Sequence, residues 1–317
     1  MNRATGIQIA GDLLRLACLE RTQSGYRLCA LFETRLIAPV LPQWPVQPRV
    51  RQCISEGLQH AFAQVQEVPG AVVISLGGGF FHVQKTPLEL ASSDDRQEHI
   101  MWEAAQTLVD PIDRYVVDYL AVGRTAFWIA IPREVVEFCS ELLSSLRVRE
   151  YRIEADPIGL FYASLLAKGR AGSSAAVMGV HPWLYFVATQ SGNLVSAEAV
   201  CVKNTREVNG LPPESLRNST NVEGTDLIIR RWLNRRRQSN RNRSEFDRIL
   251  LCGEEHQIAT LSQRIETAGG QRLESLLPFS NCTTETLQES QRHFLVNQSA
   301  FSITAGLAYM NLAKERL

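Results

Sequence analysis

Thr5–Glu20, TGIQIAGDLLRLACLE, lies near the start of the chain and is the stretch around which the remaining elements are organised. A short apolar run leads into Gly11-Asp12, and in the second run apolar side chains occupy alternate positions. Two such runs joined by a Gly-Asp turn are typical of paired strands. The stretch therefore predicts a tight β-hairpin, which can either present backbone N–H groups to a phosphate or simply open a sheet.

The composition is that of a globular protein long enough for two domains. Of the 317 residues, 45% are hydrophobic and 21% are charged, and Lys plus Arg equals Asp plus Glu at 33 each. With equal numbers of positive and negative side chains, the protein as a whole has no net charge that would attract it to nucleic acid or to an acidic membrane. No apolar run reaches the roughly 18 residues of a membrane span, and no signal peptide is evident, so we expect a cytoplasmic protein. The seven cysteines and six histidines lack metal-ligand spacing, which predicts reduced thiols and no metal site.

The elements that follow the hairpin repeat along the chain. Residues 26–36 predict a third strand, residues 50–65 a helix, and Ala71–Leu76 a strand buried on both faces. Gly77–Gly79 closes that strand, and a plain turn is favoured there over a phosphate-binding loop. The same order, three strands, a helix and a strand, returns between residues 174 and 252. The last segment, 299–317, predicts a helix that packs back across the first half.

Between the two copies lies a unit with a different order. Residues 81–156 predict strand, helix, strand, strand, helix and strand, which is the size of a small inserted subdomain. In the second copy, an arginine-rich stretch runs from Arg230 to Arg243. Such a stretch can bind nucleic acid or anionic lipid. Because Trp232 is its only aromatic residue, a solvated helix end and loop is the favoured interpretation.

A duplicated core with a terminal helix resembles the actin-like ATPase superfamily, and the inserted unit narrows the resemblance to the PilM family of type IV pilus assembly proteins. The stretches that carry it are residues 85–90 (KTPLEL), 98–104 (EHIMWEA), 117–122 (VDYLAV), 131–136 (IPREVV), 153–156 (IEAD), 249–253 (ILLCG) and 305–308 (AGLA). The resemblance implies an α/β, actin-like (ribonuclease H-like) duplicated fold with two lobes. The first lobe would be 1–80, completed by 299–317; the inserted α+β subdomain 81–156; and the second lobe 157–298.

The resemblance also implies partners and a location. A protein of this family is expected in the cytoplasm, peripheral at the inner membrane. It would be recruited by the N-terminal tail of a PilN-like single-span membrane protein, together with other pilus or secretion platform components. Membrane contact would come only through that partner, and no nucleic-acid partner is expected. Relatives bind ATP with magnesium in a central cleft, so the cleft positions of this chain decide whether a nucleotide cofactor is expected.

Three separated loops depart from the family pattern. The first hairpin should follow Asp-x-Gly-x-x-x-x-Lys, but these positions hold Gln8, Ala10 and Arg15. Gln8 cannot supply the charged ligand that organises magnesium. The second hairpin should carry Asp-x-Gly, but Met178 and Val180 stand there, followed by His181, Pro182 and Trp183. The glycine-rich adenosine loop is Gly253-Glu254-Glu255, where two carboxylates beside a polyanion are unfavourable and their side chains would fill the space of the base. The acidic position of the preceding helix is Leu227 or Ile228.

Loss in three loops at once predicts a pseudo-ATPase that kept the fold and the partner-binding surfaces. The degenerate nucleotide-pocket positions are Gln8, Ala10, Gly11, Asp12, Arg15, Met178, Val180, His181, Gly253, Glu254 and Glu255. No catalytic residue, metal ligand or cofactor is expected.

Besides nucleic-acid binding through the arginine-rich stretch, two alternatives stay open. An active ATPase or sugar kinase of the superfamily would need a carboxylate base. Asp156-Pro157 offers one, although a helix N-cap followed by Pro at the first helical position is the favoured interpretation. The other alternative is the cytoplasmic domain of a GspL-like type II secretion protein.

Overall fold

The computed structural model describes residues 2–40, 47–64, 70–88, 93–169, 171–180, 182–202, 228–235, 246–266 and 272–313. The strands are β1 Arg3–Thr22, β2 Gly25–Val40, β3 Ala71–Leu76, β4 His82–Pro87, β5 Tyr115–Val122, β6 Thr125–Pro132, β7 Tyr151–Ile153, β8 Ser173–Val180, β9 Trp183–Gln190, β10 Asn193–Cys201, β11 Arg248–Cys252, β12 Leu273–Ser275 and β13 Cys282–Thr283. The helices are α1 Pro48–Gln64, α2 Ser93–Thr107, α3 Arg133–Ser145, α4 Asp156–Lys168, α6 Glu255–Glu266, α7 Glu289–Arg292 and α8 Ser302–Ala313, with 3₁₀ segments at Ile112–Arg114 and His293–Phe301. Residues 228–235 are also helical.

The segment β1 is a hairpin of two arms rather than one straight strand. Residues 4–9 pair in parallel with β3, and residues 13–22 pair antiparallel with β2. The N–H of Arg21 donates to the carbonyl of Asn2 over 2.6 Å. A straight strand would separate these two residues by about 60 Å. Gly11 at the turn has a φ of +61°, which suits a residue without a side chain. The opening hairpin predicted from the sequence is therefore confirmed.

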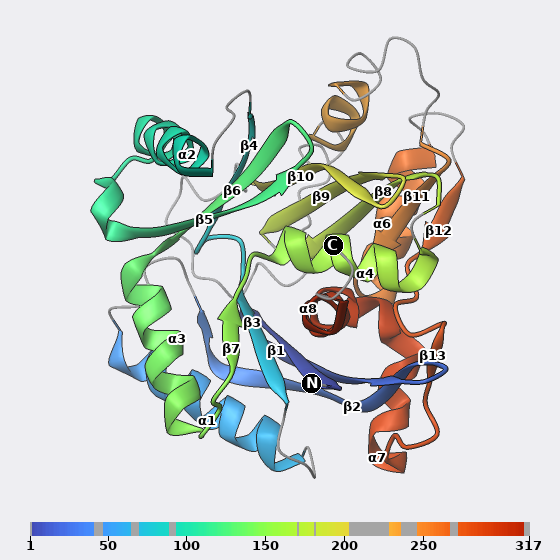
Figure 1. The fold of residues 1–317 in the computed structure, drawn as a ribbon. Helices are drawn as coiled ribbons and strands as arrows, with labels where there is room; N and C mark the ends of the chain where they lie inside the picture. The colour runs from blue at the N-terminus through green and yellow to red at the C-terminus, as the bar shows by residue number, and fades with distance from the viewer. Residues whose placement is uncertain are drawn as a thin grey trace, which may run out of the picture.

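Two five-stranded sheets of the same topology make up most of the molecule (Figure 1). Their strand orders are β13-β2-β1-β3-β7 and β10-β9-β8-β11-β12. When the two arms of β1 are counted separately, each sheet contains three consecutive antiparallel strands. Two further strands follow, and both run parallel to the third. The duplicated order predicted from the sequence is thus present in the structure. The short strand β13 adds to the outer edge of the first sheet, beside β2.

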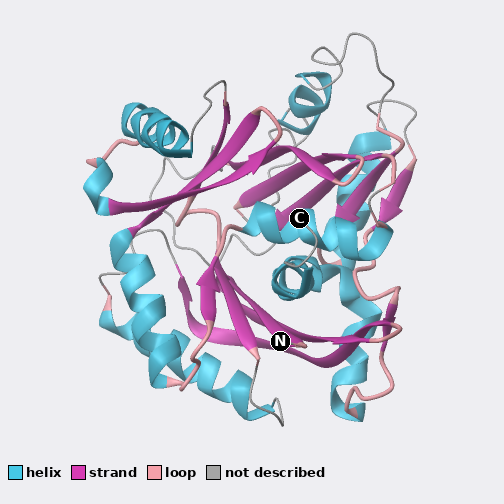
Figure 2. Cartoon of the chain, viewed as in Figure 1, coloured by secondary structure: helices cyan, strands magenta, loops and turns pink. Residues whose placement is uncertain are grey.

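Helices α4 and α8 lie between the two sheets (Figure 2). They touch at glycines: a Cβ atom on Gly306 would stand 1.7 Å from the carbonyl oxygen of Gly159. A Cβ atom on Gly6 of β1 would likewise stand 1.9 Å from the carbonyl oxygen of Thr304 in α8. Side chains are therefore excluded where α8 meets α4 on one side and the first sheet on the other. Both helices carry buried residues around their circumference, as expected for helices enclosed by other elements.

The third sheet, of order β4-β6-β5, belongs to the inserted unit. One face packs against α2, where Tyr115 and Val117 join Ile100 and Ala104 in one apolar cluster. The strand predicted to end this unit, β7, instead pairs in parallel with β3 of the first sheet. A three-residue strand carries no signal for its partner, whereas β3, α3 and β7 together form the parallel crossover that α/β folds favour.

Several sequence predictions fall partly outside the described residues. These are His181, residues 223–227 of the predicted helix, and the part of the arginine-rich stretch beyond residue 235. In the described part of the chain, no helix is long and apolar enough to cross a membrane. All seven cysteines are free thiols.

Candidate functional site

The loops predicted to surround a nucleotide do meet between the two sheets. Their own side chains form the contacts between them. Trp183, just after the β8–β9 turn, packs so closely on Gly78 that a Cβ atom there would stand 2.5 Å from the indole. The N–H of Gly78 donates to the hydroxyl of Tyr185 over 2.8 Å. The triple-glycine segment is therefore held by the second sheet, in agreement with a structural turn.

Asp156 is the centre of a cluster of buried polar side chains. Its carboxylate accepts hydrogen bonds from Gln8 Nε2 at 2.9 Å and from Ser75 Oγ at 2.5 Å, and the hydroxyl of Tyr185 also bonds to it. Burial raises the pKa of Asp156 to about 6, against the lowering effect of these three hydrogen bonds. Burial also raises the pKa of Tyr185, and the nearby Asp156 adds to the rise.

The prediction that Asp156 is a helix N-cap is wrong. Helix α4 begins at Asp156 itself, Ala155 is the N-cap residue, and no side chain caps the helix. The local sequence Asp-Pro is typical of a helix N-cap followed by the first helical residue. The Asp156 carboxylate instead accepts hydrogen bonds from strands that are far away in the sequence. Gln8, one of the predicted degenerate positions, thus donates a hydrogen bond to Asp156, and both side chains are buried.

Arg15 and Glu254 connect the opening hairpin with the loop after β11. The Nη2 atom of Arg15 lies 3.0 Å from Glu254 Oε1, and its Nε atom lies 2.6 Å from Glu33 Oε2. Only 5% of the Arg15 surface is exposed, so this cation is held between two partly buried carboxylates. Glu254 therefore points toward Arg15, whereas the sequence interpretation placed its side chain in the space of a nucleotide base. Glu255 is exposed in the first turn of α6.

At the remaining predicted positions, the side chains or the backbone make contacts within the protein itself. Ala10 is buried beside Gly77, and Asp12 forms an exposed ion pair with Arg35 at 2.7 Å. Met178 is buried between Tyr185 and Cys252 on neighbouring strands, and Val180 pairs with Trp183 across the β8–β9 hairpin. Gly253 has a φ of +128°, which explains the glycine without any ligand.

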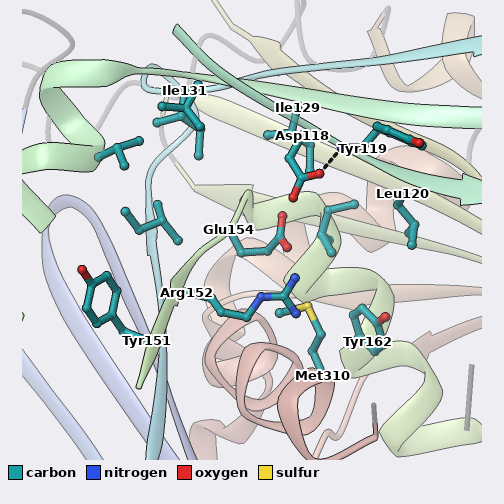
Figure 3. Close-up of a pocket in the computed structure, with 14 residues that line it drawn as sticks. Asp118, Tyr119, Leu120, Ile129, Ile131, Tyr151, Arg152, Glu154, Tyr162 and Met310 are labelled. Carbon is teal, nitrogen blue, oxygen red and sulfur yellow. Dashed lines mark hydrogen bonds between the residues drawn. The ribbon is translucent and has the colours of Figure 1, made fainter. Parts of the chain in front are cut away.

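A second feature lies at the junction of the inserted unit and the first sheet: a groove with a cavity of about 410 Å³ (Figure 3). It is lined by Val116, Asp118, Tyr119, Leu120, Ile129, Ile131, Val136, Tyr151, Arg152, Ile153, Glu154, Ile158, Tyr162 and Met310. We call it the junction groove. Among the described strands, β5 and β7 are the ends of their sheets, so each has an unpaired edge here.

The junction groove combines apolar side chains with three tyrosines and with the charged side chains of Asp118, Arg152 and Glu154. In Figure 3, Asp118 of β5 and Glu154 after β7 point toward each other, with the Arg152 guanidinium beside Glu154. Burial raises the pKa of Glu154 to about 7; the charge of Asp118 adds to the rise, while the Ala155 N–H and Arg152 oppose it. Sequence reasoning did not single out these residues as a site, because Asp118 and Glu154 are 36 positions apart in unrelated elements. In the described part of the chain, no group of three His, Cys, Asp or Glu side chains could hold a metal ion.

The duplicated sheets with α4 and α8 between them define an actin-like α/β protein, and the comparisons with solved structures confirm this fold class. A Bacteroides thetaiotaomicron protein with an actin-like ATPase fold and unknown function aligns with a TM-score of 0.53, 12% identity, and 96% and 95% of the two chains covered. The chain is also similar to a chain of the PilM-PilN type IV pilus biogenesis complex, with a TM-score of 0.73, 16% identity and 98% of both chains covered. The resemblance to PilM noted in the sequence thus extends over the whole fold.

A further alignment involves the cytoplasmic domain of EpsL, an inner-membrane component of the type II secretion system of Vibrio cholerae, with a TM-score of 0.47, 12% identity, and 85% and 97% of the chains covered. No protein-family model and no curated protein matches the sequence.

Proposed function

We propose that this protein is a PilM-like scaffold of a type IV pilus or related secretion platform. It binds the N-terminal cytoplasmic segment of a PilN-like single-span membrane protein in the junction groove. The junction groove is the observation that carries the proposal, since it is a preformed groove of apolar and polar side chains in a chain aligned end to end with one from a PilM-PilN complex. The protein would lie in the cytoplasm, reaching the inner membrane through that partner.

The physical properties of the junction groove suit an extended peptide. Its volume of about 410 Å³ falls within the range of ligand sites. The free edges of β5 and β7 offer backbone groups to a peptide that adds as a strand, and pockets for alternate side chains then give specificity. Along β5, Val116, Asp118 and Leu120 face the groove, while Tyr115 and Val117 pack on α2. One face of β5 is therefore satisfied by the fold, and the other is left for a partner.

We infer that the scaffold works without nucleotide. Arg15, at the lysine position of the family pattern, forms an ion pair with Glu254, and Gln8, at the Asp position, donates a hydrogen bond to Asp156. Trp183 and Tyr185 of β9 contact Gly78, which follows β3 of the first sheet. Because the buried Asp156 already accepts three hydrogen bonds, it lacks the exposure that a base or a magnesium ligand needs. These contacts support a pseudo-ATPase, with neither ATP nor magnesium as a cofactor.

The proposal is tested by calorimetric titration with a synthetic peptide of the cytoplasmic tail of the PilN-like protein encoded in the same genome. We expect binding that Val116→Asp, a groove residue that is 37% exposed, weakens at least tenfold. The matched control is Val109→Asp, the same change at a residue that is 96% exposed and lies outside the groove. Equal binding by both variants, or no binding by the unmodified protein, would overturn the proposal.

A further inference from the structure

We propose that the junction groove selects a partner segment with a lysine or arginine side chain, which enters between Asp118 and Glu154. This inference rests on the proposed function, in which an extended peptide occupies the groove. It adds a rule for that peptide: a basic residue at one fixed position, with apolar residues two positions before and after it.

The two carboxylates come from opposite walls of the groove and point toward each other (Figure 3). Each accepts one hydrogen bond from the backbone: Tyr119 N–H donates to Asp118 Oδ1 at 2.7 Å, and Ala155 N–H donates to Glu154 Oε1 at 3.1 Å. A carboxylate has about four acceptor sites. Among the described residues, no lysine, arginine or histidine lies within ion-pair distance of either group. Most of their acceptor capacity is therefore left for a ligand.

The charges in the junction groove favour a cation over an anion or a neutral side chain. The carboxylates of Asp118 and Glu154 repel one another, and the Glu154 carboxylate also loses solvation through burial. Arg152 is in the same cavity and moderates this, but it does not pair with them. The other titratable side chains that face the groove are the phenols of Tyr119, Tyr151 and Tyr162. An incoming ammonium or guanidinium would form charge-assisted hydrogen bonds to both carboxylates, which are the stronger kind.

The spacing of the groove wall sets the spacing in the peptide. Val116, Asp118 and Leu120 are alternate residues of β5 and therefore face the same side. Side chains of an extended peptide also share a face at every second position. When a basic side chain stands opposite Asp118, the residues two positions away meet Val116 and Leu120, which are apolar. Charge and spacing together thus specify an apolar-x-basic-x-apolar segment.

The test is a selection from a display library of random peptides against the full-length protein. Peptides whose binding is lost in Val116→Asp are taken as groove ligands. We expect them to share one basic position, and the double variant Asp118→Asn/Glu154→Gln should bind them about ten- to a hundredfold more weakly. The control Glu137→Gln/Glu141→Gln removes the same charge from exposed positions of α3 and should bind them normally.

If the double variant is unstable, Asp118→Asn alone keeps the test valid, because Asp118 is exposed. In a selection against Asp118→Lys, the peptide position that was basic should become acidic. Groove ligands without a fixed basic residue, or with unchanged affinity for the carboxylate variants, would overturn this inference and leave the peptide-binding function standing. A selection that yields no peptide sensitive to Val116→Asp would instead overturn the proposed function itself.

Discussion

Arg15 on the opening hairpin and Glu254 after β11 form an ion pair of 3.0 Å that joins the two halves of the protein. Arg15 also contacts Glu33 at 2.6 Å, so its removal leaves two carboxylates facing each other. Because both carboxylate side chains are 30% exposed, water compensates part of the loss. We predict that Arg15→Met lowers the free energy of unfolding by about 1–3 kcal/mol, measured by urea denaturation.

A matched control uses the exposed ion pair of Arg35 with Asp12, 2.7 Å apart. Arg35→Met should change the free energy of unfolding by less than about 0.5 kcal/mol. A double-mutant cycle of Arg15→Met with Glu254→Gln should show a coupling of about 0.5–2 kcal/mol. A coupling near zero would mean that the pair does not connect the two halves energetically.

The second prediction concerns nucleotide. A site that bound ATP would stabilise the protein by about 2.7 kcal/mol at a ligand concentration of about 100 times Kd. We predict no change in thermal unfolding with ATP and magnesium, because Arg15, Gln8 and Trp183, which belong to the degenerate loops, are held by internal contacts. The partner peptide, added under the same conditions, should raise the melting temperature. A saturable shift with ATP would contradict the prediction.

The repeated order of elements could be predicted because it depends on local signals. The turn at Gly11, the apolar run of β3 and the glycines after strands are each encoded by neighbouring residues. The degenerate positions could also be located by their order along the chain. Their contacts could not, because the partners of Arg15 and Asp156 are up to 239 residues away.

The facing carboxylates of the junction groove could not be predicted from the sequence. Glu154 follows a three-residue strand, and its position opposite Asp118 depends on β7 joining the first sheet rather than the inserted one. A prediction that assigned β7 to the inserted unit could not bring these two carboxylates together. Long-range pairing of a short strand is decided by the crossover through α3 and by packing, and neither is visible in a local pattern.

The third prediction uses the pKa of Asp156, which burial raises from an ordinary 3.8 to about 6. The folded state therefore binds more protons than the unfolded state between these two values, and stability falls as the pH rises through that window. The rise corresponds to about 3 kcal/mol once the group is ionised in both states. We expect Asp156→Asn to gain stability relative to the unmodified protein between pH 4 and pH 7, measured by urea denaturation at each pH.

Asp247 is the control of opposite sign. Hydrogen bonds from the N–H and hydroxyl of Ser173 lower the pKa of this exposed carboxylate, so its stabilising effect is present above the ordinary pKa and is lost as the pH falls. Asp247→Asn should therefore lose stability relative to the unmodified protein as the pH rises. If the Asp156→Asn difference were independent of pH, the raised pKa would be refuted.

The fourth prediction tests the contact between α4 and α8. A Cβ atom on Gly306 would stand 1.7 Å from the Gly159 carbonyl oxygen and 2.6 Å from the Ala163 nitrogen. These are backbone atoms, so Gly306→Ala must separate the helices that join the two sheets. Alanine favours helix by about 1 kcal/mol, but we expect the overpacking to dominate and the net free energy of unfolding to fall by about 1–3 kcal/mol.

Gly179→Ala is the control, because its Cβ atom would meet only Leu184 Cδ2 at 3.8 Å. It should be neutral or slightly stabilising. Equal stability of the two variants in urea would show that α4 and α8 can move apart without cost.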